Sequence, residues 1–446
     1  MLETVRNAFK VKDIRKRLIY TFIVLVIVRI GSQLPIPGVS REYFSQWFEQ
    51  QASALNFFNA LTGGSFTKMS IFALSITPYI TSSIIMQLLT IAIPKLEEMQ
   101  KDGEDGRKKI IEYTRYLNIG LSIIESAAMA IGFGNQGLLE DGLGFTSVTV
   151  MVVSLTAGSA VLMWFGEQIT EKGVGNGISI ILTFNIVSGM PQDFAGLYET
   201  FVKGASNTTN GIIAAVVIIA IVVAMVVFVI ILQDAVRKIP VQYAKKLQGR
   251  KMVGGQSSHI PLKVNTAGVI PVIFASSLLS LPIVISQFAG ISPASGKGAS
   301  IWQKILKVCN QGDWCNFNNI HEFKYTIGLL IYIVLVIFFA YFYTNITFNP
   351  VEVSTNLKKA GGFVPGIRPG KPTTDYLTKI LNNIIFIGAV GLTIIAVVPI
   401  FFSGAFNANV GFGGTSIIIV VGVVLETIKQ IESQMLVRNY TGFLNE

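Results

Sequence analysis

Long apolar runs alternate with short polar segments along the whole chain. Most of the runs hold about 20 residues, the length that an α-helix needs to cross a hydrocarbon core of ~30 Å. Transmembrane β-strands would be about half as long and would alternate apolar with polar residues. The pattern therefore predicts an all-α membrane protein with ten spans, at residues 18–34, 57–94, 110–133, 148–165, 178–190, 211–232, 267–288, 325–347, 380–402 and 415–431.

The second run, residues 57–94, departs from this pattern. Gly63 and Gly64 interrupt it, Lys68 follows, and no further charge occurs before its end. Inside a bilayer, such a break is tolerated only where protein or a water-filled cavity surrounds it. Ile80 and Ile84 then stand one helical turn apart. Downstream of the break, a polar stripe is expected at Ser75, Thr77, Thr81, Ser82 and Ser83. We therefore expect an apolar constriction beside a polar cavity.

Composition supports a membrane protein. The 446 residues are 51% hydrophobic and 13% charged, with a mean hydropathy of +0.59. Soluble domains carry about 25% charged residues. The formal charge of +10 is gathered in a few loops, as membrane topology requires, so it does not by itself indicate a nucleic-acid partner.

The charges also orient the chain. Basic residues mark the loops at 95–115, 237–263 and 348–379 as cytoplasmic, whereas Glu140 and Asp141 lie in a loop without Lys or Arg. The first run follows a basic N-terminus but lacks a small-residue cleavage site, so we expect a retained span rather than a signal peptide. Both termini are then cytoplasmic.

Ten spans divide into two sets of five, and an odd number per half would make duplicated halves inverted with respect to each other. We expect an N-terminal half at 1–195, with spans 1–5, and a C-terminal half at 196–446, with spans 6–10 and basic loops at 234–263 and 348–379. No clear residue-level repeat relates the halves, so this symmetry rests on parity alone.

Two of the loops expected in the cytoplasm have features that membrane topology alone does not require. Residues 237–263 hold seven basic residues and no acidic one, and Arg368 lies in a stretch rich in glycine and proline that would present it on a turn. We expect these loops to bind an anionic partner, which would be lipid head groups, ribosomal RNA or an acidic protein face. Residues 167–177 predict a tight glycine-rich turn between helices.

Residues for catalysis or metal binding are missing. The chain has no Walker motif, no H-E-x-x-H and no nucleophile elbow, and only two histidines. We expect no enzymatic activity, no metal and no cofactor. Cys309 and Cys315 share one polar outer loop, where a disulfide and two free thiols are both compatible with the sequence.

The spans contain few ionisable residues, chiefly Arg29, Glu125 and Glu426. An ion-coupled transporter normally places several such groups inside its spans. A gated polar conduit with an apolar waist fits better. An inverted-repeat secondary transporter is the alternative, and a membrane scaffold that recruits ribosomes without conducting is a third reading.

Six stretches resemble the SecY family, the pore subunits of bacterial general secretory translocons. They are RIGSQLPIPG at 29–38, GGSFTKMSIFALSITPYITSSII at 63–85, GVGNGISI at 173–180, YAKKLQGRK at 243–251, HIPLKVNTAGVIPVIFASS at 259–277 and PGIRPGKPT at 365–373. Their order and their positions relative to the spans also fit, over nearly the whole length.

The resemblance implies a clamshell of two halves around an hourglass pore, hinged between spans five and six, through which unfolded polypeptides pass. It implies a pore ring at Ile80, Ile84, Leu182, Ile270, Ile273 and Ile419, with Leu182 where the family commonly has isoleucine. It implies a plug at about 57–70, including Phe58, Leu61, Gly63, Gly64 and Phe66. A lateral gate would open between the helix from residue 72 onward and the seventh span.

The resemblance further implies docking at Arg250, Lys251 and Arg368. The implied partners are the small membrane subunits SecE and SecG, the SecA motor ATPase, the ribosome with its RNA and proteins, signal sequences and nascent polypeptides, and membrane lipids. The implied location is the bacterial cytoplasmic membrane.

Overall fold

The computed structural model describes residues 6, 8–40, 43–44, 46, 59, 61–140, 142–203, 208–243, 246–248, 251–253, 257–288, 300–311, 314–315, 323–406 and 414–442. A long helix lies at each predicted span. These helices are α2 (Lys12–Gly31), α4 (Thr77–Ala92), α6 (Glu104–Asn135), α7 (Phe145–Lys172), α8 (Gly177–Leu197), α9 (Thr208–Asp234), α10 (Ile270–Phe288), α12 (Ile327–Thr347), α14 (Lys371–Phe406) and α15 (Gly414–Gly442). The fold is therefore predominantly helical.

Shorter elements join these helices. They are α5 (Pro94–Lys101), the π-helix η1 (Tyr198–Lys203), α11 (Ile301–Cys309), the 3-10 helix η3 (Phe323–Thr326) and α13 (Pro350–Lys359). Within the described residues, five helices are long and apolar enough to cross a membrane alone, and six if α4 and α5, which meet at a bend of 103°, form one span.

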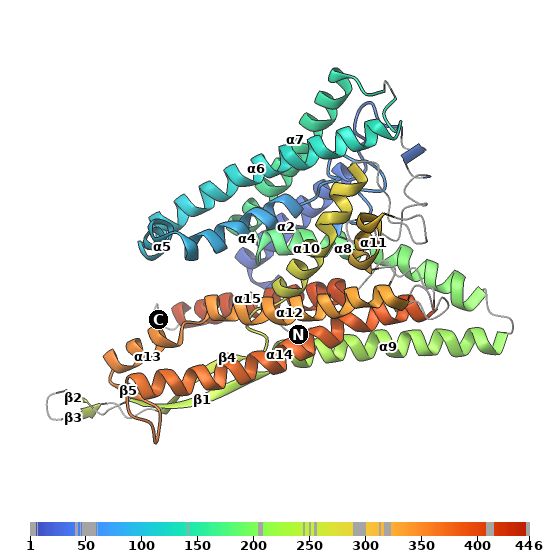
Figure 1. Cartoon of the computed structure of the whole chain (residues 1–446). Coiled ribbons are helices and arrows are strands. Elements are labelled where there is room, and N and C mark those ends of the chain that lie inside the picture. The colour runs from blue at the N-terminus through green and yellow to red at the C-terminus, as the bar shows by residue number, and fades with distance from the viewer. Residues whose placement is uncertain are drawn as a thin grey trace.

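The long helices pack in two groups (Figure 1). In one group α6 packs on α4 and α7, and α7 on α2. In the other, α14 packs on α12 and α15, and α15 on α9. Two helices join the groups, because α8 contacts both α7 and α15, and α10 contacts both α6 and α12. Figure 1 shows α10 running obliquely between them.

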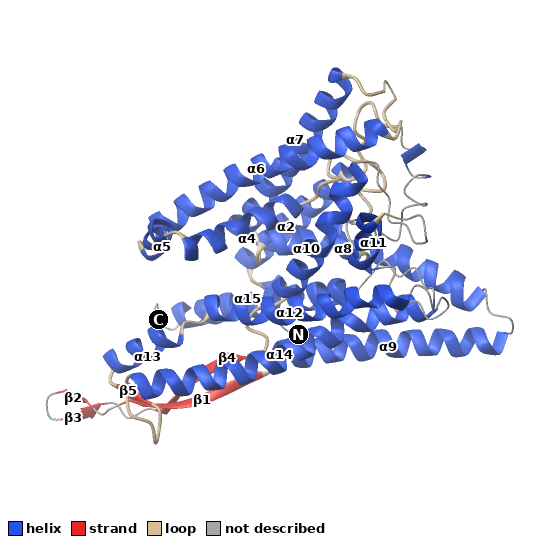
Figure 2. Ribbon diagram, viewed as in Figure 1, coloured by secondary structure: helices blue, strands red, loops and turns tan. Residues whose placement is uncertain are grey.

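A small sheet extends beyond one end of the helices (Figure 2). Its strands β1 (Val236–Tyr243) and β4 (Ser257–Lys263) are antiparallel, and β5 (Gly362–Phe363) pairs with the end of β1. A separate hairpin joins β2 (Lys246–Gln248) to β3 (Lys251–Val253). Alternation along the strands buries Ile239, Val241 and Leu262 against α13 and α14, so the sheet is held on the membrane domain.

Several predicted boundaries are wrong. The helix expected from residue 72 begins at Thr77, because residues 63–76 form successive turns in which Met69 and Ser75 have positive φ. The turn expected at 167–177 is shorter, since α7 continues to Lys172. Pro271 makes no kink because it is the second residue of α10, where its missing N–H is not needed.

The loop at 348–379 was expected to present side chains rather than pack them. Instead it contains α13 and β5, and it buries Leu357 and Val364 in the apolar cluster under the sheet. Asn349 starts α13 by accepting hydrogen bonds from the backbone N–H groups of Val351 and Glu352. The glycines and prolines that follow end the helix, but the apolar residues between them still pack.

Candidate pore, plug and cytoplasmic surface

A small apolar cluster lies where the two helix groups meet. Its buried members are Leu61, Leu182, Ile186, Ile273 and Ile419, and Ile80, Met190, Val269, Val420 and Val423 pack against it. The residues come from the segment before α4 and from α4, α8, α10 and α15. We call this set the central cluster.

Four of the six predicted ring residues lie in the central cluster, namely Ile80, Leu182, Ile273 and Ile419. The other two are not members of the central cluster: Ile84 is buried elsewhere, and Ile270 is half-buried. Ile186 was missed by the sequence reasoning, although it follows Leu182 by four residues and so shares its helix face. Leu61, expected in the plug, completes the cluster.

The glycine break is seated against α2 and α8. Arg29 donates from Nη1 to the carbonyl oxygen of Gly63 at 3.0 Å. Gly63 has φ +62°, and a Cβ atom there would lie 2.5 Å from the carbonyl oxygen of Asn185. The side chain of Asn185 donates to Ser75 Oγ at 3.2 Å. Arg29 therefore faces the protein interior, and Gly63 is needed for a close approach of two backbones.

The other side of this segment packs against α6 and the segment that follows α2. Phe66 and Met69 are buried in a second cluster with Phe44 and Phe133. The ring centroids of Phe44 and Phe66 are 5.8 Å apart, and those of Phe44 and Phe133 are 5.1 Å apart. Backbone hydrogen bonds join Ile36 N to the Met69 carbonyl and Ile71 N to the Leu34 carbonyl, each at 3.0 Å.

Lys68 is half-buried and donates to Gln33 Oε1 at 2.9 Å. The break is thus largely enclosed by protein. Of the predicted plug residues, Leu61, Gly63, Gly64 and Phe66 lie in the described part, and Phe58 lies outside it.

Two hydroxyl groups of α4 are hydrogen-bonded to carbonyl oxygens of the same helix. Thr81 Oγ1 donates to the Thr77 carbonyl at 3.1 Å, and Ser82 Oγ donates to the Pro78 carbonyl at 2.7 Å. These groups are satisfied within their own helix. The polar group that does reach across is Gln87, whose Oε1 accepts a hydrogen bond from the hydroxyl of Tyr343 in α12 at 3.0 Å.

Tyr343 and Gln87 thereby join α12 to α4, which belong to different helix groups. The aromatic ring of Phe274 in α10 lies beside those of Phe339 and Tyr343, at centroid distances of 5.0 and 5.6 Å. Because α10 also packs on α6, this side of the molecule is closed by helix contacts.

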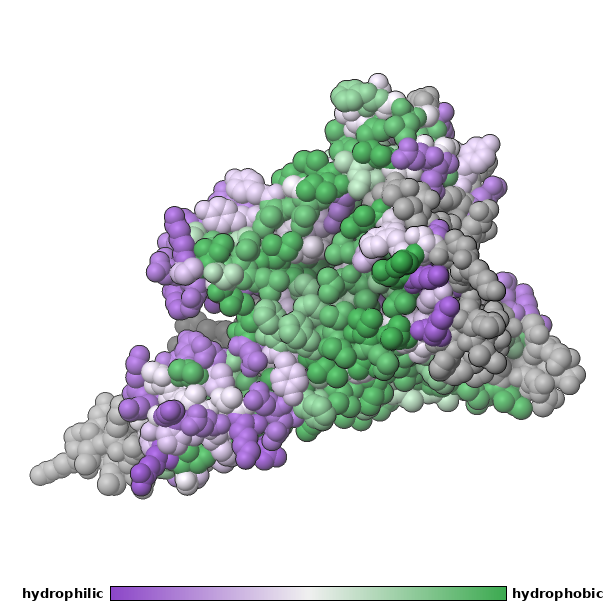
Figure 3. All heavy atoms as spheres, viewed as in Figure 1, coloured by the Kyte–Doolittle hydropathy of each residue, from purple (hydrophilic) through white to green (hydrophobic). Residues whose placement is uncertain are grey.

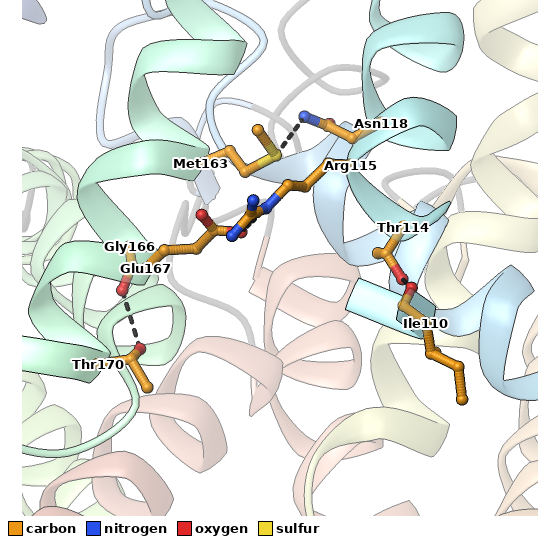
Figure 4. A network of polar contacts seen from close by, with 8 residues as sticks. All are labelled: Ile110, Thr114, Arg115, Asn118, Met163, Gly166, Glu167 and Thr170. Atoms are coloured by element: carbon orange, nitrogen blue, oxygen red, sulfur yellow. Dashed lines mark hydrogen bonds and ion pairs between the residues drawn. The ribbon is translucent and has the colours of Figure 1, made fainter. Parts of the chain in front are cut away.

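A polar network fastens α6 to α7 (Figure 4). Arg115 Nε lies 2.7 Å from Glu167 Oε1, and Asn118 donates to Met163 Sδ at 3.1 Å. The sequence alone does not predict these two pairs, because their members lie 52 and 45 positions apart along the chain. The network keeps the first helix group together.

Exposed basic residues cover the sheet of β1, β4 and β5 and its neighbouring helices. They are Arg237, Lys238, Lys263, Lys358, Lys359, Arg368 and Lys371. Arg368 lies on the turn between β5 and α14, where its own carbonyl accepts a hydrogen bond from Thr373 Oγ1 at 2.8 Å. Lys251 begins β3, and Arg250 lies outside the described residues. Figure 3 shows hydrophilic residues gathered at this end of the molecule.

The two cysteines of the outer segment are free thiols, Cys309 half-buried and Cys315 buried. Burial raises the pKa of both thiols, which keeps them protonated at neutral pH. Among the described residues, no group of three or more His, Cys, Asp or Glu side chains is placed to hold a metal ion.

A family model described as SecY matches residues 70–428. The chain is 44% identical to the protein translocase subunit SecY of Halalkalibacterium halodurans and 42% identical to that of Bacillus subtilis, over 100% of each chain. It also resembles a solved protein-conducting channel, with a TM-score of 0.64 and 19% identity over 95% of this chain and 93% of the other.

Two further solved structures are similar. A SecY structure described by its plug domain has a TM-score of 0.63 and 19% identity, over 95% of this chain and 92% of the other. Sec61 in a canine ribosome–channel complex has a TM-score of 0.60 and 18% identity, over 95% and 93%. At these identities the solved structures establish a shared fold.

Proposed function

The chain belongs to the SecY family, and from that membership we propose that it is a protein-conducting channel of the membrane. It lets unfolded secretory polypeptides cross and releases transmembrane segments sideways into lipid. Its relatives at 42% and 44% identity are protein translocase subunits. The chain acts as a conduit and not as an enzyme, so the energy for transport comes from a motor, from translation or from the membrane potential.

The central cluster is the observation that carries this proposal. Side chains from five segments of the chain meet there, and all of the buried ones are leucine or isoleucine. A transported polypeptide has an arbitrary sequence, so its passage requires a compliant apolar seal that offers few hydrogen bonds. An apolar constriction also excludes water and ions when no chain occupies it. The proposed pore ring is Ile80, Ile84, Leu182, Ile270, Ile273 and Ile419.

The proposed plug is the segment at 57–70, with Phe58, Leu61, Gly63, Gly64 and Phe66. The position of Leu61 in the central cluster and of Phe66 beside Phe44 supports a segment that closes the pore from its outer side. The hydrogen bonds that join it to other segments include those from Arg29 to Gly63, from Lys68 to Gln33 and from Ile36 to Met69. A single hydrogen bond contributes about 1 kcal/mol net, or about 1.5–3 kcal/mol when a charged group takes part, so displacement is feasible.

The proposed halves, 1–195 and 196–446, separate along the line where α4 and α6 meet α10 and α12. The contact of α10 with α6 and the hydrogen bond from Tyr343 to Gln87 support a closed lateral gate along this line. Apolar segments would leave by this route because lipid solvates them better than the pore does. The hinge lies between α8 and α9.

Arg250, Lys251 and Arg368 are proposed to dock the SecA motor and the ribosome. The exposure of Arg368 on a turn supports this role, as does the basic surface around it. Ribosomal RNA is a polyanion, and its binding by Lys and Arg is long-ranged and salt-sensitive. The similarity to Sec61 in a ribosome complex is consistent with the ribosome as a partner.

The other proposed partners are SecE, SecG, signal sequences, nascent polypeptides and membrane lipids. The proposed location is the bacterial cytoplasmic membrane, with both termini in the cytoplasm. Its support is the bacterial origin of the relatives and the number of Lys and Arg residues in the loops at 95–115, 234–263 and 348–379.

The test is to crosslink a stalled secretory polypeptide to single cysteines in the pore. Ile84→Cys and Ile273→Cys, in a chain whose two native cysteines are replaced by alanine, should each form an adduct with the arrested polypeptide. Ala275→Cys is the matched control because Ala275 lies two residues from Ile273 on α10 but is buried in a different cluster. No adduct at either ring position, or equal adducts at Ala275, would refute the pore.

A further inference from the structure

The outer segment between α10 and α12 contains a short helix that the channel function does not use. This helix, α11, starts after Ser300, whose backbone N–H donates to Gln303 Oε1 at 2.9 Å. Leu306 and Lys307 are buried on its protein side. In the described part of the chain its other side is exposed, which makes the composition of that side informative.

The exposed side of α11 is apolar. Ile301 is 78% exposed, and Trp302 and Ile305 are each 43% exposed. At about 100° per residue these three side chains fall within one arc of about 100°. A helix lying on protein under water presents its polar residues outward, and α11 does the reverse. Such an exposed apolar face marks a surface that contacts something other than water.

The helix is hydrogen-bonded to α10, and it also contacts α12. The indole N–H of Trp302 donates to Ser286 Oγ of α10 at 2.7 Å. Gln311 Nε2, just after α11, donates to Ser276 Oγ at 3.3 Å. Trp314 is fully buried and donates to the Val308 carbonyl at 2.8 Å. α11 therefore has a fixed position at the end of two spans.

The apolar face continues the membrane-facing surface of those spans. Leu281 and Ile285 of α10 are 52% and 60% exposed, and Ile327 of α12 is 53% exposed. Ile285 precedes the serine that holds Trp302. Figure 3 shows hydrophobic residues covering the middle of the molecule as far as the position that α11 has in Figure 1, where hydrophilic residues begin. The helix thus lies at the boundary of the apolar surface.

We propose that α11 is an interfacial helix in the headgroup layer of the outer leaflet, with Ile301, Trp302 and Ile305 inserted among the lipids. Tryptophan is enriched at this depth, where its ring is apolar and its N–H finds a partner. Amphipathic helices bind such surfaces through buried apolar area. Lys304 borders the arc and suits lipid phosphates. Because Trp302 donates a hydrogen bond to Ser286, lipid bound around Trp302 also stabilises the outer end of α10.

The test uses tryptophan quenching in the full chain reconstituted into vesicles of brominated phosphatidylcholine. The part of the emission that Trp302→Phe removes is the Trp302 signal. We expect it to fall at least twofold with bromine near the headgroup, and less with bromine near the bilayer centre. Trp164→Phe gives the positive control, since Trp164 is 53% exposed on α7, and Trp314→Phe the negative one, since Trp314 is buried.

Three results would overturn the proposal. Quenching of the Trp302 signal by aqueous iodide alone would place the face in water, and quenching by neither agent would mean that a protein covers it. Stronger quenching by deep than by shallow bromine would make α11 part of a span. If Trp302→Phe does not fold, a nitroxide on Ile305→Cys, with both native cysteines replaced by alanine, answers the question. It should collide more with oxygen than with a water-soluble nickel chelate, and the opposite ratio refutes the proposal.

Discussion

Two apolar clusters of the molecule consist of similar residue types but differ in size. The cluster of the C-terminal helices has sixteen buried residues, among them Val229, Val272 and Leu392, whereas the central cluster has five. Membrane helices associate mainly through van der Waals packing, so the cluster with more packed side chains contributes more to stability. We call the larger set the C-terminal core.

Adjacent residues are divided between the two clusters. In α10, Val272 and Ala275 lie in the C-terminal core while Ile273 lies in the central cluster, and in α15 Ile418 and Ile419 divide in the same way. One face of each of these helices thus packs in the C-terminal core, and the other face packs in the central cluster. Separating the two helix groups at this small cluster therefore costs less free energy than opening either group.

The largest expected effect is on stability. Leu392→Ala in the C-terminal core should lower the free energy of unfolding by about 3 kcal/mol, within the usual range for a buried leucine. Leu182→Ala makes the same truncation in the central cluster and should cost less than half as much, because its neighbours can close the smaller gap. Thermal unfolding in detergent measures both. Equal losses would show that the central cluster is as much a part of the core as any other region.

The second prediction concerns ion leak. Deleting residues 58–67 should raise the resting conductance of reconstituted bilayers severalfold, since Leu61 leaves the central cluster, while the C-terminal core and the melting temperature change little. Leu392→Ala should show the opposite combination, with lower melting temperature and unchanged conductance. An unchanged conductance after the deletion would contradict the plug.

A comparison of Gly63 with its neighbour Gly64 tests the close approach between the glycine break and α8. In Gly63→Ala the new methyl group would meet the Asn185 carbonyl, whereas in Gly64→Ala it would have no neighbour within 4 Å. Both positions have positive φ, so both substitutions carry similar backbone strain, about 1 kcal/mol. Only Gly63→Ala should also raise resting conductance, which planar-bilayer recordings would measure. Equal leak in both variants would mean that the close approach to α8 is unimportant.

Two tyrosines of α12 provide the next comparison. Tyr343→Phe removes the hydrogen bond to Gln87 between the helix groups, and Tyr332→Phe removes an acceptor of Ser276 within the C-terminal core. Each change is worth about 1 kcal/mol. Tyr332→Phe should lower the melting temperature, while Tyr343→Phe should about double the crosslinking of a weakly hydrophobic signal sequence to α4. Identical behaviour of the two variants would remove Gln87 and Tyr343 from the gate.

The smallest effect is on thiol chemistry. Cys315 is buried in the C-terminal core and Cys309 is half-buried at its edge, and burial raises the pKa of both. The reactive thiolate is therefore scarce at neutral pH, and its fraction should keep rising above the usual thiol pKa. Mass spectrometry after maleimide treatment should show Cys309 reacting before Cys315, at rates that increase with pH. Faster reaction at Cys315 would mean that this part of the core opens.

Much of the fold could be predicted because membrane spans depend on local sequence. Each run of about 20 apolar residues had to become a helix, since no other structure satisfies its own backbone hydrogen bonds in lipid. The boundaries were less certain. Thr77 rather than residue 72 begins α4 because Met69 and Ser75 adopt positive φ, which neither residue type announces.

The candidate site was partly predictable. Helical spacing grouped Ile80 with Ile84 and Ile270 with Ile273, and family resemblance supplied the rest, but Ile84 and Ile270 lie outside the central cluster while Ile186 lies inside. Spacing along one helix says which residues share a face and not which face turns toward another helix. The same limit hid the pairing of Arg115 with Glu167.

By itself, the sequence determined a predominantly helical membrane fold, the broken second segment, the basic loops and the absence of catalytic motifs. These properties follow from composition and local order along the chain. Only the tertiary structure decided which apolar residues form the central cluster, how Arg29 and Asn185 hold the break, and that α11 turns its apolar face outward. Such contacts join residues far apart in sequence, and they depend on how whole helices rotate and pack, which a local pattern does not fix.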